Sequence, residues 1–353
     1  RAPLFGDVPK GREVLEGFED FVEGGVAIDA RGPTGVAADG PGAMEEFVNG
    51  AFLRGSYPIP HGVFGGKTGM RCGTMPPSLD GGDRSLGVVD ACQGRFTSDE
   101  LNSWLDQDSL VLFTASKFYQ APPFCGAVIL PESVASKLRD APPPSKGMLG
   151  QNGLGGFITD AELPPCMKGW ASGLRQRGAG NVGLALRWEA GLAGMEALIS
   201  GSGKTEEERT RASDEWARRV TEAVNARGTL DAWCVERTIV SIRVKRSTVG
   251  EGEEGGWRSM KELRDLYRWM SMDASVLVPD ASAEDGEALS VPAYIGQPVD
   301  VSDGHAIVRI ALGSEGLLSY LEDPEGTLRE DEKVIAKLDA IARNFDALKG
   351  SGQ

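Results

Sequence analysis

The sequence predicts an α/β fold with a parallel-rich sheet, followed by a smaller α+β part. Two short apolar runs, 85–90 and 109–115, flank a helix signal. This strand–helix–strand order is typical of a parallel sheet covered by helices. Two long helical stretches come next, and then a run in which polar and apolar residues alternate, as in a half-buried strand. The length of 353 residues suits one large domain or two ordinary ones.

The first predicted strands carry a polar residue at or near the end of each. Ser85–Asp90 is apolar and ends in a carboxylate, which predicts a buried parallel strand. Thr97–Glu100 is a capping box and predicts a short helix through Trp104. Ser109–Ala115 and Cys125–Leu130 predict a second and a third buried strand. A helix near 43–53 and a surface loop over 141–156 complete this part.

Beyond residue 180 the pattern becomes mainly helical. A long helix is predicted from Asn181 to about Ile199, and a second, highly charged helix over 206–226. Trp233–Val244 alternates polar and apolar residues and predicts one half-buried strand. The last predicted elements are a helix near 260–270, a strand over 306–312 and a helix over 330–348.

These elements divide the chain into three parts. We expect a large domain over 1–180, connecting helices over 181–227 and a small α+β domain over 228–353. The pattern shows no internal repeat.

Composition and charge exclude several classes of function. The net charge of −15 would repel a phosphate backbone, so no nucleic-acid partner is expected. No apolar run reaches 18 residues, so no membrane span is expected. The five cysteines form no C-x-x-C pair, which favours a reducing cytoplasm or organelle matrix over secretion. The two histidines are far apart and indicate no metal site.

Asp90 and Lys117 form the strongest chemical pairing in the sequence. Asp90 ends one predicted strand, and Lys117 lies just beyond the end of the next. Ligands of open α/β sheets bind outside the carboxyl ends of the strands, so both side chains can reach one ligand. Pyridoxal 5′-phosphate (PLP) needs a lysine amine for its aldehyde and a carboxylate beside its pyridine nitrogen. The pair therefore indicates a PLP site.

Neighbouring polar residues fit the same cofactor. Gln93 is expected to hydrogen-bond the phenolic oxygen of the ring, while Thr114 and Ser116 offer hydroxyls to the phosphate. Each residue alone has a plainer explanation, because a strand-terminal Asp is often a cap and a loop Lys is usually solvated. Their order along the chain favours the cofactor site.

The stretch from Val88–Gln93 through Phe113–Ala127 resembles the class V aminotransferase group of fold type I PLP enzymes. That group includes cysteine desulfurases and kynureninases. The resemblance implies an aspartate aminotransferase-like PLP-dependent transferase fold, a homodimer, and Lys117 as the residue that forms the internal aldimine and shuttles protons. In the better-known members a His precedes the lysine, whereas here Ser116 does.

The resemblance also implies a substrate residue near the C-terminus. Arg309 lies in an apolar strand, where related families place the arginine that binds the substrate carboxylate. A structural salt bridge is the alternative for Arg309. Cysteine desulfurase chemistry is disfavoured, because the last cysteine, Cys234, lies far before Arg309 rather than shortly before it.

The predicted activity is that of an aminotransferase-like enzyme acting on an amino acid or related amine. Lyase and hydrolase chemistry remain open. The short segment before Asp90 shows neither a phosphate-binding turn nor a residue to stack on the ring, so we expect an N-terminally incomplete copy. The stretch Gly66–Gly69 could line the site, but its interpretation as a flexible surface turn is favoured. The alternative function is a degenerate, non-catalytic PLP-fold scaffold or binding subunit.

Overall fold

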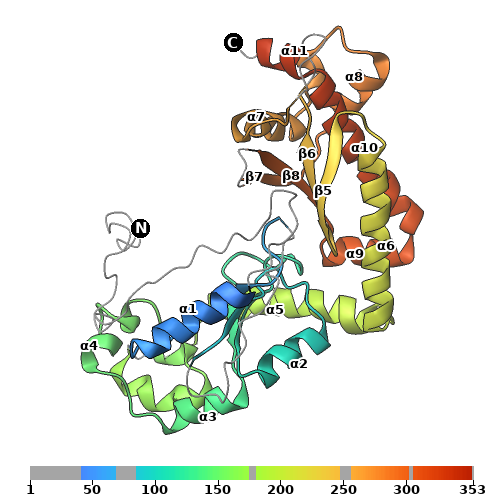
Figure 1. Ribbon diagram of the computed structural model, residues 1–353. Helices are drawn as coiled ribbons and strands as arrows, with labels where there is room; N and C mark the ends of the chain where they lie inside the picture. The colour runs from blue at the N-terminus through green and yellow to red at the C-terminus, as the bar shows by residue number, and fades with distance from the viewer. Residues whose placement is uncertain (1–40, 69–84, 175–179, 247–255, 302–304, 352–353) are drawn as a thin grey trace.

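The computed structural model describes residues 41–68, 85–174, 180–246, 256–301 and 305–351 (Figure 1). Within these ranges the main strands form two four-stranded sheets, and each sheet is built from one stretch of the chain. None of the helices in the same ranges combines the length and apolar character that a membrane span requires.

The first sheet is α/β in character and parallel-rich, which confirms the predicted fold class. Its first three strands are parallel to one another, and the fourth is antiparallel to the third. The strands, in their order across the sheet, are β1 (His61–Val63), β2 (Val88–Asp90), β3 (Leu110–Thr114) and β4 (Gly126–Ile129).

One feature of this sheet corrects the sequence prediction. The stretch 125–130 was expected to be a third buried strand, but Gly126, Ala127 and Val128 of β4 are exposed. The strand pairs on one side only, with β3, so its apolar residues cover the edge of the described sheet rather than its interior. An apolar run alone cannot distinguish an edge strand from a central one.

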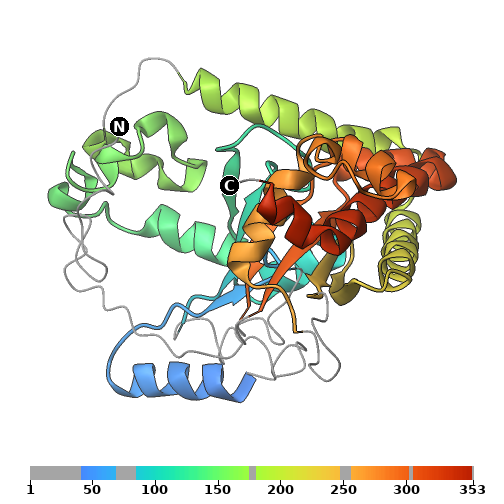
Figure 2. The same ribbon diagram turned by 90° about the horizontal axis from the view of Figure 1, so that it is seen from above.

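Helices flank the first sheet. α2 (Ser98–Asp106) begins at the predicted capping box and buries Trp104 against Phe64, with ring centroids 4.7 Å apart. Seen from above, α1 (Pro41–Leu53) and α5 (Val182–Glu196) lie on opposite sides of the sheet (Figure 2). The predicted loop over 141–156 contains short helical segments, and these and the other elements of this part are α3 (Glu132–Asp140), α4 (Lys146–Leu149), η1 (Leu154–Gly156), η2 (Asp160–Glu162) and η3 (Pro165–Gly173).

A glycine brings α5 close to the turn that follows β3. A Cβ atom at Gly191 would lie 2.7 Å from Ala115 Cβ and 3.6 Å from Cys125 Sγ, so only glycine fits there without a shift. The helix continues through a π-helical turn, η4 (Ala197–Gly201), and the chain then enters α6 (Glu206–Asn225), which runs alongside the second sheet (Figure 1).

The second sheet is antiparallel throughout. Its strands follow the order β5 (Leu230–Glu236), β6 (Ile239–Val244), β8 (Ala306–Ala311) and β7 (Gly296–Asp300). The prediction of one strand over 233–244 is wrong, because the chain reverses at Arg237, which has a φ of 49°. Alternation continues through such a tight turn, and the turn sequence contains no glycine or proline to reveal it.

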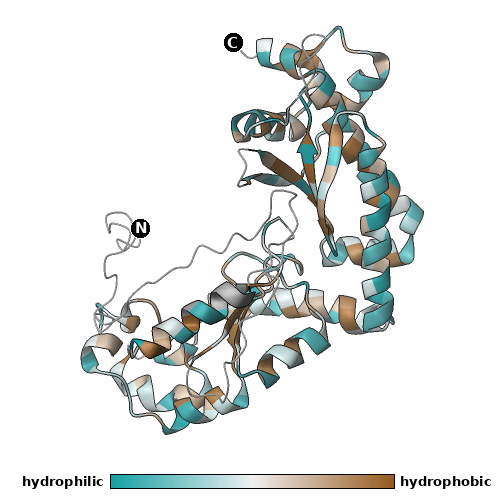
Figure 3. Ribbon diagram, in the orientation of Figure 1, coloured by the Kyte–Doolittle hydropathy of each residue, from teal (hydrophilic) through white to brown (hydrophobic). Residues whose placement is uncertain are grey.

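Helices on the second sheet build the larger core (Figure 3). They include α7 (Met260–Met270), as predicted, together with η5 (Ser275–Leu277), α8 (Ala283–Ser290), α9 (Ser314–Glu322), α10 (Pro324–Arg343) and α11 (Phe345–Gly350). The C-terminal helix begins earlier than position 330, because Asp323 caps it and Pro324 takes its first position.

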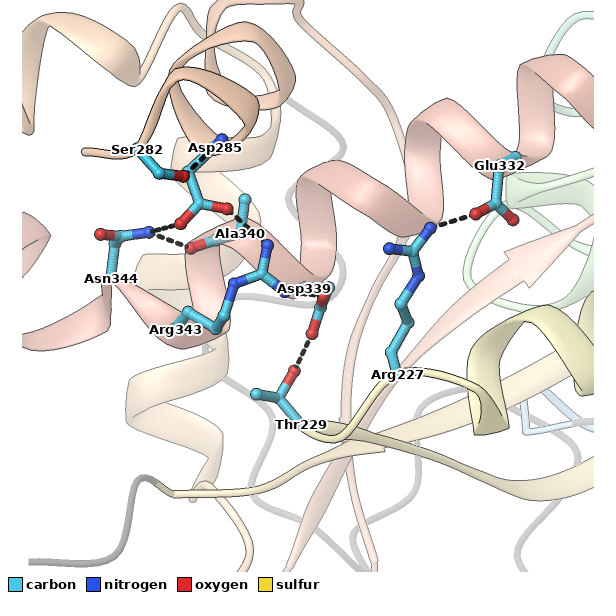
Figure 4. Close-up of polar contacts among 9 residues, drawn as sticks. All are labelled: Arg227, Thr229, Ser282, Asp285, Glu332, Asp339, Ala340, Arg343 and Asn344. Carbon is cyan, nitrogen blue, oxygen red and sulfur yellow. Dashed lines mark hydrogen bonds and ion pairs between the residues drawn. The ribbon is translucent and has the colours of Figure 1, made fainter.

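A polar cluster ties α10 to its neighbours (Figure 4). Arg343 bonds both Asp285 of α8 and Asp339 of its own helix, and Asp339 accepts from Thr229 beside β5. Burial favours the neutral form of Asp285, but the bonds from Arg343 and Asn344 outweigh it and hold its pKa below the usual range. The cluster fixes the helix layer against the sheet without depending on apolar packing alone.

Candidate functional site

The carboxyl ends of β1, β2 and β3 meet at one edge of the first sheet, and the predicted site residues lie there. Asp90 is the last residue of β2 and pairs with Leu112 of β3. Its Oδ1 atom accepts from the backbone N–H of Cys92 at 3.1 Å, so the turn after β2 holds the carboxylate in place. Asp90 is half-buried, whereas Lys117 is exposed and free to meet a ligand at this edge.

The charges of Asp90 and Lys117 both act on the Cys92 thiol. Burial is the main cause that raises the pKa of Cys92 to about 12, and a hydrogen bond with Asp90 and its charge raise it further. The ammonium of Lys117 acts in the opposite direction. Asp90 and Lys117 therefore both lie within electrostatic range of the same thiol.

Thr114 and Ser116 are bonded to each other in the turn before Lys117. The Thr114 hydroxyl donates to the carbonyl of Cys125 at 2.6 Å, which uses its single hydrogen. In the 2.9 Å contact between the two hydroxyls, Ser116 must therefore be the donor. Both hydroxyl hydrogens are then engaged within the turn. To donate to a phosphate, as predicted, Ser116 would have to rotate away from Thr114.

The loop after β2 places Gln93 against an arginine that sequence reasoning missed. Arg95 Nη1 donates to Gln93 Oε1 at 2.9 Å and to the Gln93 carbonyl at 3.2 Å. The same guanidinium reaches the second sheet, donating to Thr238 Oγ1 at 2.7 Å and to the carbonyl of Leu312 at 3.4 Å. Burial, and then the charge of Arg309, lower the pKa of Arg95 to about 10.

Arg309 projects from β8 toward the same edge. Its Nη1 donates to the carbonyl of Lys67 at 2.6 Å, and its Nη2 to the carbonyl of Gln297 at 3.0 Å. Nε is buried and has no hydrogen-bond partner among the described residues. Gly296 makes room for the group, because a Cβ there would lie 2.8 Å from Nε. The salt-bridge alternative finds no carboxylate partner for Arg309 in the described part of the chain.

The turn after β1 takes part in this arrangement, contrary to its interpretation as a surface turn. Lys67 supplies the carbonyl that Arg309 bonds, and the carbonyl of Thr68 accepts from the buried Ser241 hydroxyl at 2.9 Å. Gly69 lies outside the described residues. These bonds join the first sheet to the centre of the second, at the edge where Asp90 lies.

A second contact docks the corner between β8 and α9 on the turn that carries Lys117. The Ser314 N–H donates to the carbonyl of Phe118 at 2.7 Å, and the Glu315 N–H donates to Gln120 Oε1 at 3.2 Å. Two groups therefore meet at the site. Asp90, Cys92 and Lys117 belong to the first sheet and the turns after its strands, whereas Arg95 and Arg309 make the hydrogen bonds that join this part to the second sheet.

Other expectations have simpler outcomes. Cys92, Cys125 and Cys166 form no disulfide with any described residue, and Cys72 lies outside the described residues. No group of histidine, cysteine and carboxylate side chains in the described ranges could hold a metal ion.

Comparison with known proteins gives partial structural likenesses. No protein-family model matches the chain, and no curated protein matches it. Rhodiola rosea 4-hydroxyphenylacetaldehyde synthase aligns with a TM-score of 0.46 and 14% identity, over 82% of this chain and 53% of its own. Phosphoserine aminotransferase SerC from Cytophaga hutchinsonii gives a TM-score of 0.40 and 14% identity, over 77% of this chain and 62% of its own.

A third likeness is to Oryza sativa TDC, solved with PLP, with a TM-score of 0.42 and 11% identity, over 85% of this chain and 56% of its own. The chain thus spans less than two thirds of the length of each of these structures. At such identities and TM-scores the function rests on the residues of the site itself.

Proposed function

We propose that this chain binds PLP and acts on an amino acid or a related amine, as a class V aminotransferase-like enzyme. The observation that supports this most directly is the pairing of Asp90 and Lys117. They follow adjacent parallel strands at one sheet edge, and their charges act on the same thiol. A carboxylate and an exposed amine so placed fit a pyridine ring that bears an aldehyde. Transamination is the proposed reaction, and lyase or hydrolase chemistry fits the same residues.

Each residue has a defined part in this proposal. PLP, when bound, supplies an electron sink for bonds at the substrate's α-carbon. Asp90 keeps a proton on the pyridine nitrogen, because a nearby carboxylate favours the charged form of its partner. Lys117 Nζ would hold the cofactor through its aldehyde carbon, with release of water, and would later move the substrate proton. Gln93 would donate to the phenolic oxygen, and the Arg309 guanidinium would bind a substrate carboxylate.

Borohydride reduction tests the assignment of Lys117. Reducing PLP-loaded protein should fix the cofactor covalently on Lys117, because borohydride converts a carbon–nitrogen double bond to a stable amine. Peptide mapping by mass spectrometry locates the label. The matched control is Lys67→Ala, which removes another exposed lysine near this edge and should leave labelling intact. A label on a different lysine, with Lys117 unmodified, overturns the assignment.

One observation favours the alternative of a non-catalytic scaffold. The hydroxyls of Thr114 and Ser116 are engaged within their own turn rather than open to a phosphate. The visible absorption spectrum separates the two functions, since PLP bound to a lysine absorbs visible light and a scaffold without cofactor does not. Failure of saturating PLP to produce that absorption supports the scaffold.

A homodimer belongs to the same proposal, as the family resemblance implies. Its support in this structure is the apolar surface of α5, where Val182, Leu186 and Leu192 are exposed. The three-part division into residues 1–180, 181–227 and 228–353 likewise remains a proposal. It is consistent with the order along the chain, in which the first sheet precedes α5 and α6 and the second sheet follows them.

A further inference from the structure

We propose that Arg95 is a positioning residue that locks the Gln93 amide when the second sheet is docked, so that the arrangement of the two sheets controls the polar contact to the cofactor ring. This inference rests on the proposed function, because it concerns the residue assigned to the phenolic oxygen. It adds a residue and a regulatory link that the proposed function does not contain.

The first step is the set of bonds that one guanidinium makes. Nη1 holds Gln93 by both its side-chain and its main-chain oxygens, at 2.9 and 3.2 Å. Nε holds Thr238 in the turn between β5 and β6 at 2.7 Å, and Nη2 holds the carbonyl of Leu312 just after β8. A shift of the second sheet would therefore break the bonds that fix Arg95, and with them the position of Gln93.

The second step is the orientation that Arg95 imposes on Gln93. A side-chain amide has an acceptor and a donor end, and either can face a given partner after rotation. A guanidinium only donates, so it binds the oxygen and leaves the amide nitrogen as the free end. A phenolate oxygen requires a donor. Arg95 thus selects the one orientation of Gln93 that can serve the ring.

The third step concerns the cost of this arrangement. The four hydrogen bonds of Arg95 end on neutral oxygens, and no carboxylate in the described ranges pairs with it. Burying a cation without a counter-charge is unfavourable. Arg237, the neighbour of Thr238, makes the ordinary link between the same two regions, an ion pair with Glu100 at 2.7 Å. A cation without a carboxylate is better explained by its effect on Gln93.

The fourth step connects Arg95 to the turn that carries Lys117. The Arg95 guanidinium lies 5.3 Å from the ring centroid of Phe118, which directly follows Lys117. Phe118 is itself bonded to the corner before α9 through its carbonyl. Arg95 therefore packs between both turns at the sheet edge and the second sheet, where a change in docking reaches Gln93 and Lys117 together.

The test measures the pH midpoint of the visible absorption of bound PLP. A donor at the phenolic oxygen stabilises its negative charge and weakens its hold on the neighbouring imine proton, so losing that donor raises the midpoint. Gln93→Ala gives the full effect, expected to be about one pH unit. Thr238→Val removes one partner of Arg95 and should raise the midpoint in the same direction, as should Arg95→Lys. Activity is not needed for this measurement.

Arg237→Gln is the matched control. It breaks the Arg237–Glu100 ion pair between the same regions but contacts neither Gln93 nor Arg95, so its midpoint should equal that of the wild type. Thermal melts check that each variant folds. If Arg95→Lys does not fold, Thr238→Val still tests the proposal, because valine is nearly isosteric with threonine.

The possible failures are distinct. If wild-type protein gives no visible absorption and no borohydride label, the proposed function falls and this inference with it. If the wild type binds PLP and Gln93→Ala shifts the midpoint while Thr238→Val and Arg95→Lys do not, only the role of Arg95 is overturned. An equal shift in Arg237→Gln overturns it as well, because docking in general would then be responsible.

Discussion

Asp90 is the residue whose replacement separates a chemical role from a structural one. Its Oδ1 atom accepts from the Cys92 N–H, and the amide oxygen of asparagine can accept the same bond. Asp90→Asn should therefore keep the fold and the turn while losing the negative charge beside the ring nitrogen. We expect activity to fall about tenfold or more, since one pKa unit on that nitrogen corresponds to about 1.4 kcal/mol. Turnover assays measure the loss of activity, and thermal melts measure the retained stability. Turnover at the wild-type rate would mean that Asp90 has only a structural role.

The reactivity of the Cys92 thiol tests the placement of Asp90 and Lys117 in protein that contains no cofactor. Burial is the first cause of its raised pKa of about 12, Asp90 adds to it and Lys117 opposes it. Only the thiolate is alkylated readily, so Asp90→Asn should speed the reaction of Cys92 with iodoacetamide, and Lys117→Gln should slow it. Mass spectrometry of the Cys92 peptide at mildly alkaline pH gives both rates. Unchanged rates in both variants would contradict the placement of the two charges.

Arg95 shows where prediction from sequence ended at this scale. Asp90, Gln93 and Lys117 could be predicted as site residues because each stands at or shortly after the end of a predicted strand. Arg95 stands alone in a glycine-containing loop, and its partners Thr238 and Leu312 lie 143 and 217 residues away. No local pattern records contacts of that range.

At the scale of elements, the signals that proved reliable were those fixed by local chemistry. The capping box at Thr97 marked the start of α2, and the helix predicted near 260–270 matches α7. The exposure of β4 and the turn at Arg237 were missed, because both depend on strand pairing rather than on local sequence. The sequence predicted which segments are strands better than where in a sheet they lie.

The start of α7 allows a prediction about pH. Glu262 caps the helix through the N–H and hydroxyl of Ser259, and it pairs with Arg246 at 2.8 Å. Burial favours the neutral form of Glu262, but these bonds outweigh it and lower its pKa to about 2. A carboxyl whose folded pKa is lowered contributes stability above its unfolded pKa of about 4.3, and that contribution is lost as the pH falls toward the folded value.

Glu262→Gln should therefore lower the free energy of unfolding at pH 7 by about 1–2 kcal/mol, a figure already reduced for solvent screening of the pair. The gap between variant and wild type should narrow as the pH falls from about 5 toward 2. Urea denaturation across this range measures the gap. Glu330→Gln serves as a control, because among the described residues that carboxylate forms an ion pair only with the exposed Lys333. A gap independent of pH would mean that the charge of Glu262 is not what stabilises the helix.

For the whole molecule, the sequence indicated the α/β class but not how the two sheets meet. The contacts that join them use backbone carbonyls of Lys67, Thr68 and Phe118, which carry no sequence signature. The docking therefore depends on the folded path of each turn. The candidate site depends on this docking and not on the motif alone.

The surface of α5 bears on assembly at the same scale. A mostly apolar helix is normally buried, yet Val182 and Leu186 of α5 are 64% and 66% exposed. In a twofold dimer each contact occurs twice, so one substitution acts at two places. Burying a leucine contributes about 1.5–3 kcal/mol, and Leu186→Glu should thus weaken a dimer more than 100-fold.

Sedimentation of the chain at micromolar concentration tests the dimer. We expect the wild type to sediment with twice the mass of one chain and Leu186→Glu with the mass of one. Leu53→Glu makes the same change at an exposed leucine of α1, on the other side of the first sheet, and should leave the dimer intact. If the wild type is a monomer, the homodimer is wrong for this chain. If Leu53→Glu dissociates the dimer and Leu186→Glu does not, the interface lies on α1, and the apolar surface of α5 needs another explanation.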